Sequence, residues 1–183
     1  LVEDFRGTRV AGFDIAGDEA GFPIDAHVAA FHYAQDRRIP CTAHAGEASG
    51  APSVWDTLDN FHPSRIGHGV RSSEDAALLD YLRAHNIHLE VCPSSNLQTN
   101  MYADYANHPI DRLYRDGVSV GVNTDARTIT NITLTEEYEK LHETFGWGAE
   151  RFLRCNTNAL QAAFIAEDVR ADLLRRLAAG YVT

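Results

Sequence analysis

Short, almost wholly apolar runs alternate along this chain with longer stretches in which apolar side chains recur at helical spacing. The apolar runs predict strands over residues 9–17, 39–43, 65–69, 87–91 and 118–122. The amphipathic stretches predict helices over residues 24–38, 53–61, 134–145, 149–164 and 167–179, with Ser53 as the cap of the second. Two further helices are predicted between the strands. One is capped by Ser72 or Ser73 and carries Leu78, Leu79 and Leu82, and the other has Pro109 near its first turn. Strand and helix thus alternate as five successive βα units.

This alternation indicates an α/β protein whose parallel sheet is covered by helices. Two folds of that kind fit. A doubly wound nucleotide-binding sheet requires a glycine-rich phosphate loop, and no G-x-G-x-x-G or Walker sequence occurs. Polar residues instead follow strand after strand, which favours a (β/α) barrel of the TIM type, whose active site lies at the carboxyl ends of its strands. Because five units are too few to close an eight-stranded barrel, we expect an incomplete one.

The composition restricts the possible partners. The 183 residues suffice for one domain with a core, and 44% hydrophobic and 23% charged residues are an ordinary globular balance. A formal net charge of −10 without a basic stripe argues against a nucleic-acid partner. No apolar run approaches the roughly 20 residues that span a bilayer, and no signal peptide opens the chain, so no membrane association is expected. Three widely spaced cysteines, Cys41, Cys92 and Cys155, indicate reduced thiols in a cytoplasmic protein rather than a cysteine zinc site.

Residues suited to chemistry stand at the carboxyl ends of the predicted strands. They are Asp14 and Gly17, His44 and Glu47, His68, Ser95 and Asn96, and Asp125. Several have a local explanation as well: Asp14 in a local pair, His68 in a tight turn, and Asp125 as the cap of the next turn. Because a barrel brings its strand ends to one mouth, their coincidence favours a shared site. The residue types are those of metal-assisted hydrolysis.

Zinc is the metal that these side chains suit. A catalytic zinc binds nitrogen and oxygen ligands and keeps a position for water, and His44 and Asp125 supply two such ligands. Two are too few, so at least one more must come from outside this stretch. Glu47 is placed to carry protons, and His68 to orient a metal-bound hydroxide or to take up its proton. Gly17 leaves room for a flat substrate beside a backbone N–H.

Five short motifs carry a resemblance to a known family. They are D-I-A-G-D-E at residues 14–19, H-A-G-E at 44–47, G-H-G at 67–69, C-P-S-S-N at 92–96 and N-T-D at 123–125. In order and spacing they resemble the adenosine deaminase family of zinc hydrolases over essentially the whole chain. The resemblance implies a (β/α)₈ barrel, of which residues 1–183 are the carboxyl-terminal part with roughly its last five βα units. It also implies hydrolytic removal of the 6-amino group of a purine nucleoside, adenosine or 2′-deoxyadenosine, in purine metabolism.

The same resemblance implies a role for each motif residue. His44 and Asp125 are zinc ligands in one Zn²⁺ site. Glu47 donates a proton to purine N1, and His68 activates the zinc-bound water. The implied substrate-binding residues are Gly17, Asp18 and the residue at Ala126, and the implied supporting residues behind the site are Asp14 and Ser95.

The chain departs from the family pattern in its zinc ligands. The family's other two ligands form a His-x-His pair on its first strand, and no H-x-H occurs here. The amino-terminal half of the barrel is therefore the expected missing partner. We expect the isolated chain to lack stoichiometric zinc, activity and stable folding, because a half barrel exposes two strand edges and an apolar interior.

A second departure lies at Ala126. Family members carry an acid or an amide there that bonds purine N7, and Ala cannot make this bond. Leaving N7 unpaired costs about 1–3 kcal/mol. Arg127 either offers N7 a donor or is a solvated loop side chain. An aminohydrolase of adenine or of another aminated purine is therefore an alternative to one of adenosine, and a non-catalytic purine-binding relative is a third possibility.

Overall fold

A four-stranded parallel sheet lies at the centre of the computed structural model, which describes residues 1–181. Its strands are β1 (Thr42–Ala45), β2 (Arg65–His68), β3 (His88–Val91) and β4 (Ser119–Val122), hydrogen-bonded in that order. The register pairs His44 with Gly67, and Glu90 with both Gly67 and Gly121. At least one helix follows each strand, as the βα pattern predicts.

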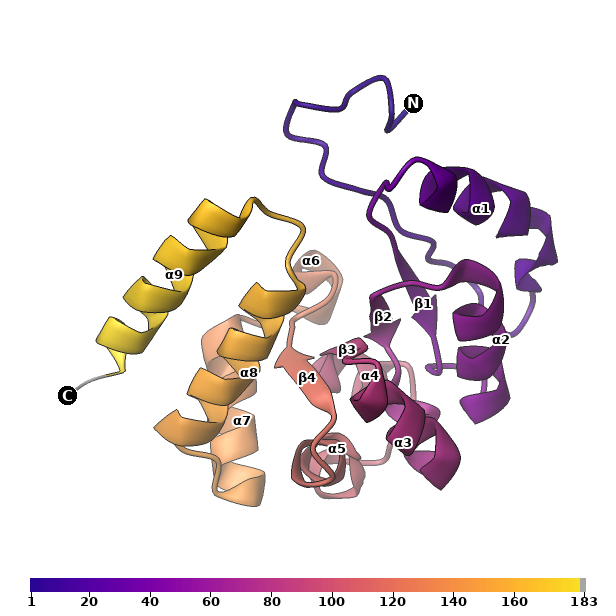
Figure 1. Ribbon diagram of the computed structural model, residues 1–183. Helices are drawn as coiled ribbons and strands as arrows, with labels where there is room; N and C mark the ends of the chain where they lie inside the picture. Colours follow the sequence, from indigo (N-terminus) through magenta and orange to yellow (C-terminus); the bar gives the residue numbers. More distant parts are fainter. Residues whose placement is uncertain (182–183) are drawn as a thin grey trace.

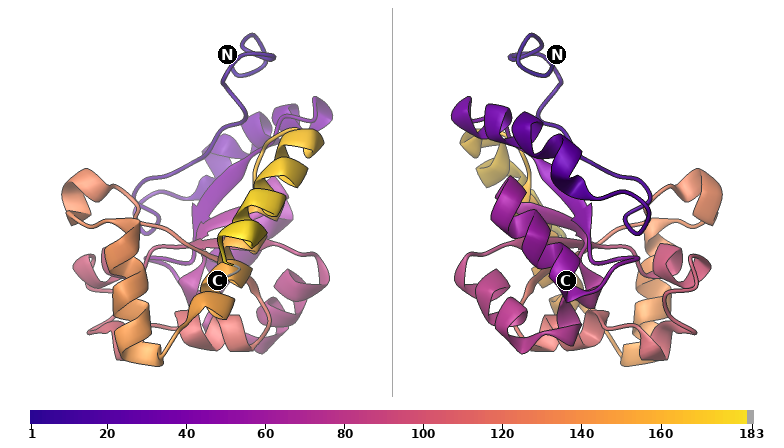
Figure 2. Two further views of the ribbon diagram at one scale, coloured as in Figure 1. Left: turned by 90° about the vertical axis from the view of Figure 1, so that its left-hand side faces the viewer. Right: turned by 90° about the vertical axis from the view of Figure 1, so that its right-hand side faces the viewer.

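The helices surround this sheet. They are the 3-10 turns η1 (Ile24–His27), η2 (Val70–Glu74) and η3 (Tyr105–Asn107), and the helices α1 (Val28–Asp36), α2 (Ala51–Phe61), α3 (Ala76–Ala84), α4 (Pro93–Gln98), α5 (Ile110–Arg115), α6 (Arg127–Thr130), α7 (Leu134–Phe145), α8 (Ala149–Ala162) and α9 (Glu167–Gly180). In Figure 1, α1, α2, α3 and α5 follow one another around the strands, while α7 and α8 lie beside β4. Both views in Figure 2 show the amino-terminal segment projecting from one end of the molecule. Within the described residues, no helix is long and apolar enough to cross a membrane.

The hydrophobic core lies between the strands and these helices. Alternate strand residues such as Ile66, Leu89 and Val120 are fully buried, and they belong to one cluster with the apolar faces of α2, α3 and α5. Because strand side chains alternate in direction, the other face of the sheet carries His44 and Glu90. This face is more polar, and it is the one from which the site is built.

The predicted strand over residues 9–17 is wrong in extent. It forms a single bridge, between Phe13 and Cys41. The segment does run beside β1, since the N–H of Phe13 donates to the carbonyl of Pro40 (3.2 Å) and the N–H of His44 donates to the carbonyl of Ile15 (2.9 Å). The N–H of Thr42 in turn donates to the carbonyl of Phe13 (3.1 Å), but Pro40 has no N–H, so the pairing cannot extend toward residues 9–11. For the same reason β1 starts at Thr42 rather than at residue 39, and it includes His44.

The predicted helix starts also need correction. Gly50, not Ser53, is the N-cap of α2, and Ser53 lies within the helix. Neither predicted serine caps α3: residues 70–74 form the turn η2, and the Asp75 carboxylate accepts the N–H of Ala77 (2.8 Å) at the start of α3. Asp75 has the extended backbone that an N-cap needs, whereas Ser72 and Ser73 lie inside η2.

Two short helices were not predicted. α4 occupies the polar stretch after Cys92, and α6 directly follows Ala126. Pro93 stands at the first position of α4, where its fixed φ favours a helix and its missing N–H costs nothing. Both helices begin close to a strand end, so they turn the residues of the C-P-S-S-N and N-T-D motifs toward the site.

Candidate active site

The predicted chemical residues converge at the carboxyl ends of the four strands. His44 lies in β1 and His68 is the last residue of β2, and their ring centroids are 5.1 Å apart. Ser95 and Asn96 lie in α4, directly after β3, and Asp125 follows β4. The structure therefore brings together groups that are up to 81 residues apart (125 − 44) in the sequence.

Asp14 holds one side of the His44 ring. Its Oδ2 lies 2.9 Å from His44 Nδ1. This nitrogen is buried and has no partner along its own N–H direction, so the contact is a close charge contact and not a linear hydrogen bond. The Asp14 carboxylate raises the pKa of His44, against the effect of burial. A carboxylate behind one ring nitrogen orients the other for a metal, which is the arrangement common behind zinc-bound histidines.

Gly67 makes room for the same ring. A Cβ atom at this position would lie 2.8 Å from both Cγ and Nδ1 of His44. Such a separation is shorter than van der Waals contact, so any larger residue would displace the ring. Gly67 is therefore required by the His44 ring on β1, and not only by the tight turn that the G-H-G motif predicts.

An amide group links the predicted proton carrier to the second histidine. The Asn96 side-chain NH₂ donates to Glu47 Oε1 (2.9 Å) and lies 3.1 Å from His68 Nδ1. On its other side, His68 Nε2 lies 3.5 Å from Glu47 Oε2. Burial lowers the pKa of His68, which favours the neutral ring. Asn96 thus contacts both groups that the sequence assigns to proton transfer.

His108 fixes the direction of this amide. Its Nδ1 accepts the backbone N–H of Ile110 (3.2 Å), so the neutral ring carries its proton on Nε2, which donates to Asn96 Oδ1 (3.1 Å). Burial lowers the pKa of His108 to about 3, so the ring is neutral near pH 7. Glu47 can only accept, which independently turns the Asn96 NH₂ toward it. Both constraints agree, and they leave His68 with an accepting Nδ1 and a protonated Nε2.

Asp125 is oriented by Ser95 and by an uncommon backbone. The Ser95 hydroxyl donates to Asp125 Oδ2 (2.7 Å). Asp125 has φ +56° and His68 has φ +59°, values in the left-handed region that residues other than glycine seldom adopt. Such backbone persists where surrounding contacts hold it, and it is concentrated at functional sites.

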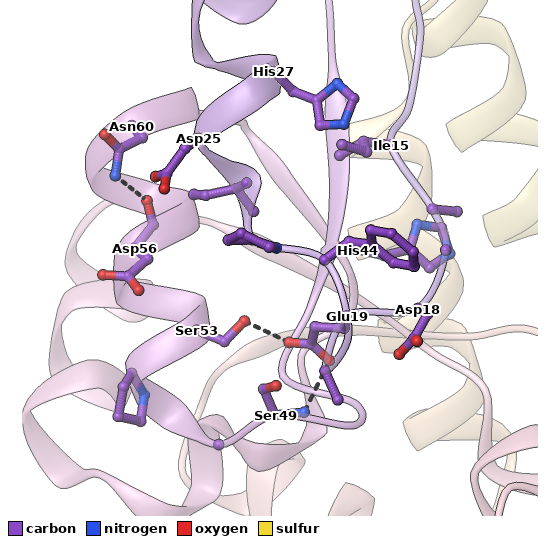
Figure 3. Close-up of a pocket in the computed structure, with 18 residues that line it drawn as sticks. Ile15, Asp18, Glu19, Asp25, His27, His44, Ser49, Ser53, Asp56 and Asn60 are labelled. Carbon is purple, nitrogen blue, oxygen red and sulfur yellow. Dashed lines mark hydrogen bonds between the residues drawn. The ribbon is translucent and has the colours of Figure 1, made fainter.

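Gly17 and Asp18 line a cavity of about 850 Å³ that reaches His44 (Figure 3). A methyl group on Gly17 would meet nothing within 4 Å, so the space beside its backbone is open. Asp25, Asp56 and Asn60 also line the cavity, and Figure 3 shows them on the side opposite His44. Ala126 lies before α6, where its carbonyl accepts the N–H of Ile129 (2.7 Å), and Arg127 is exposed.

The metal-type residues form only part of a site. Within residues 1–181, no group of three or more His, Cys, Asp or Glu residues could hold a metal ion. His44 and Asp125 supply the nitrogen and oxygen that zinc accepts, and each is oriented from behind, by Asp14 and Ser95. These two side chains therefore fit as two of the ligands of a zinc site whose other ligands come from outside this chain.

Sequence reasoning assigned no role to four residues that support this site. Asn96 stands at a predicted strand end and Glu19 closes the D-I-A-G-D-E motif, but neither position indicates a supporting role. His108 lies in a loop, where the only signal was a histidine before Pro109 and a helix. Glu137 is fully buried in α7 and accepts the N–H of Ser94 (3.0 Å), which holds the start of α4 in place.

Histidine, glutamate and aspartate side chains at the carboxyl ends of barrel-type strands are the groups from which hydrolases of this fold class build their active sites. The family model described as adenosine deaminase matches residues 1–180. The chain therefore belongs to the adenosine deaminase family.

Individual relatives agree with this family and with the fold. An adenosine deaminase of Mycobacterium ulcerans is 42% identical over 181 residues, which cover 93% of this chain and 50% of that protein. An adenine deaminase of Rhizobium leguminosarum bv. trifolii is 41% identical over 168 residues, with 92% and 52% covered. The solved adenine deaminase of Arthrobacter aurescens superposes with a TM-score of 0.90 at 26% identity, covering 94% of this chain and 53% of that one. The α/β fold of barrel type is thus confirmed, and the chain spans about half the length of the curated relatives it matches.

Proposed function

We propose that this chain is the carboxyl-terminal part of a zinc-dependent purine aminohydrolase that converts adenosine and 2′-deoxyadenosine to their inosine products. The observation that carries the proposal is the linked group of Glu47, Asn96 and His68 beside His44. A purine-binding protein without turnover has no need for a proton-carrying carboxylate held at a metal-type histidine. Membership of the adenosine deaminase family supports the same reaction class.

Each residue has a defined task in this proposal. His44 and Asp125 hold zinc together with ligands from outside this chain. When bound, zinc lowers the pKa of a water molecule and so supplies a nucleophile near neutral pH. Glu47 takes up one proton of the attacking water and gives it to purine N1, which keeps it in the 6-oxo product. The remaining proton of that water goes to the departing amino group, so the step releases ammonia. The proposal places the purine ring beside Gly17 and Asp18, which border the cavity that reaches His44.

The hydrogen-bond directions favour one of the two roles considered for His68. Because its Nδ1 accepts from Asn96, its Nε2 carries a proton and is a donor in the ground state. In this form the ring orients and stabilises an attacking oxygen rather than removing its proton. Proton removal then falls to Glu47, whose Oε2 lies 3.5 Å from the same Nε2.

A second substrate class is favoured by Ala126. Its side chain cannot bond purine N7, and relatives of similar identity include an adenine deaminase. Adenine or another aminated purine is therefore the alternative substrate, handled by the same chemistry.

The test uses the native full-length polypeptide that contains this chain. Ultraviolet absorbance follows deamination of adenosine, 2′-deoxyadenosine, adenine and N6-substituted analogues, each with and without a chelator. Chelator-sensitive turnover of adenosine is expected, with Glu47→Gln reducing the rate at least about 100-fold while zinc content is kept. Turnover of adenine alone would select the second substrate class. A zinc-containing Glu47→Gln enzyme at full rate would refute the role of Glu47, and a protein without zinc or turnover would leave the purine-binding reading.

A further inference from the structure

The carboxylate of Glu19 holds the loop between β1 and α2. The donors are the backbone N–H groups of Gly46 (2.6 Å), Glu47 (3.1 Å), Ala48 (2.7 Å) and Ser49 (3.0 Å) and the hydroxyl of Ser53 (2.5 Å). Figure 3 shows the Glu19 side chain between Ser49 and Ser53, with both contacts drawn. Five donors on two oxygens use essentially all the acceptor capacity of a carboxylate.

This contact suits an ionised carboxylate. Burial raises the pKa of Glu19, but the hydrogen bonds from Ser53 and from the loop together bring it below its ordinary value. Successive backbone N–H groups that turn toward one side form a concave anion site, and here the anion is a side chain of the same protein. The first turn of α2 adds a favourable helix dipole, since Ser53 lies in that turn.

The loop has little freedom to adopt another shape. Gly46 has φ +69°, and a Cβ atom there would lie 2.5 Å from Val54 Cγ2. The tight turn therefore rests directly on α2. Glu47 is held at two points: Glu19 binds its backbone N–H, and Asn96 binds its side chain.

Glu19 also belongs to the segment that borders the cavity. It follows Gly17 and Asp18 directly, and Asp18 closes its own turn by accepting the N–H of Gly21 (3.0 Å). One carboxylate thus joins the stretch expected to contact substrate to the stretch that carries Glu47.

We propose that Glu19 is a positioning residue, which fixes Glu47 relative to the Gly17–Asp18 segment and so to the substrate. The inference rests on the proposed function for its effect on rate, whereas the hold on the loop is independent of any activity.

The experiment compares Glu19→Gln, Ser53→Ala, Glu47→Gln and the Glu19→Gln/Glu47→Gln double variant in the native full-length polypeptide. Glu19→Gln keeps the side-chain volume but turns an NH₂ group toward N–H donors. We expect kcat to fall about 10- to 100-fold with KM changed less than about 3-fold and zinc content unchanged, as for other groups behind a catalytic residue. Ser53→Ala is the graded comparison, since it removes one of the five donors to Glu19 and keeps all four loop contacts, and its kcat should fall less than that of Glu19→Gln.

Two readouts distinguish positioning from general support. In the Glu47→Gln background, Glu19→Gln should reduce kcat by less than about 2-fold, because an effect passing through Glu47 cannot be lost twice. Amide hydrogen exchange at residues 46–49 should accelerate in Glu19→Gln and stay slow in Ser53→Ala.

Full additivity of the two substitutions, or unchanged exchange at residues 46–49, would overturn the proposal. If Glu19→Gln does not fold, Glu19→Asp replaces it, since it keeps the charge but is one methylene too short to reach all five donors. If the native polypeptide deaminates no purine, the proposed function fails, and hydrogen exchange alone still decides whether Glu19 holds the loop.

Discussion

Gly67→Ala is the substitution whose effect can be worked out most directly from the structure. The new Cβ would lie 2.8 Å from Cγ and Nδ1 of His44 and 3.0 Å from its Cδ2. Carbon atoms in good contact are about 3.5–4.0 Å apart, so the ring must move by roughly 0.7–1 Å or the strands must separate. Overpacking of this kind costs about 1–3 kcal/mol of stability. Displacement also breaks the 2.9 Å contact between His44 and Asp14.

A shift of about 1 Å at a reacting group can cost about 100-fold in rate, so a fall of this order in kcat/KM is expected together with weaker zinc binding. The assay measures purine deamination, zinc content and thermal unfolding of the full-length variant. Gly180→Ala is the control, because a methyl group there meets nothing within 4 Å. Wild-type rate, zinc content and stability in Gly67→Ala would refute the position assigned to the His44 ring.

Three further substitutions or conditions test other parts of the site. Asn96→Ala should lower kcat about 10- to 100-fold, because Glu47 and His68 both lose the amide contact. The control is Thr99→Ala, which removes only a hydroxyl bonded to the carbonyls of Ser95 and Asn96. Equal rates in the two variants would contradict the role of Asn96 in linking Glu47 to His68. Ser95→Ala should weaken zinc affinity about 10- to 100-fold, measured by competition with a chelator, since Asp125 loses its 2.7 Å hydrogen bond; unchanged affinity would remove Asp125 from the ligand set. Acid should destabilise the fold: burial lowers the pKa of His108 to about 3 and that of His88 to about 4, so both rings are neutral when folded but gain a proton when unfolded below about pH 6.5. Their contribution to the free energy of unfolding is complete above that pH and is lost as pH falls toward about 3–4, with a slope of up to about 1.4 kcal/mol per pH unit for each ring. Urea unfolding at about pH 7, 6 and 5 measures this loss, and a constant stability across these values would contradict the prediction.

Much of this architecture could be predicted from the sequence because it depends on periodicity. The apolar runs at residues 65–69, 87–91 and 118–122 coincide with β2, β3 and β4 to within a residue, and α7 has the predicted bounds. The segment 9–17 has the same apolar character but forms only one bridge, because strand pairing also depends on the neighbouring segment, where Pro40 prevents extension toward residues 9–11. Hydrophobicity alone does not contain that information.

The site was predictable where a residue follows a strand and not where a distant side chain supports it. His44, His68 and Asp125 were found because barrel strands end at one mouth. Asn96 lies at such an end too, yet its role depends on His108, which arrives from a loop and shows no periodic signal. Glu19 is 27 residues before Gly46, and only the fold shows that its carboxylate meets the loop amides.

The separation between the two walls of the cavity has a consequence for enzyme engineering. On the wall with His44 and Glu19, the Glu19 carboxylate bonds the loop that carries Glu47, so substitutions there are expected to disturb the proposed reaction. On the opposite wall, the Asn60 side chain bonds the carbonyl of Asp56 within its own helix, and Asp25 lies in a short turn. We therefore expect a library confined to Asp25, Asp56 and Asn60 to change what this cavity accepts while the hydrogen bonds that hold Glu47 stay as they are.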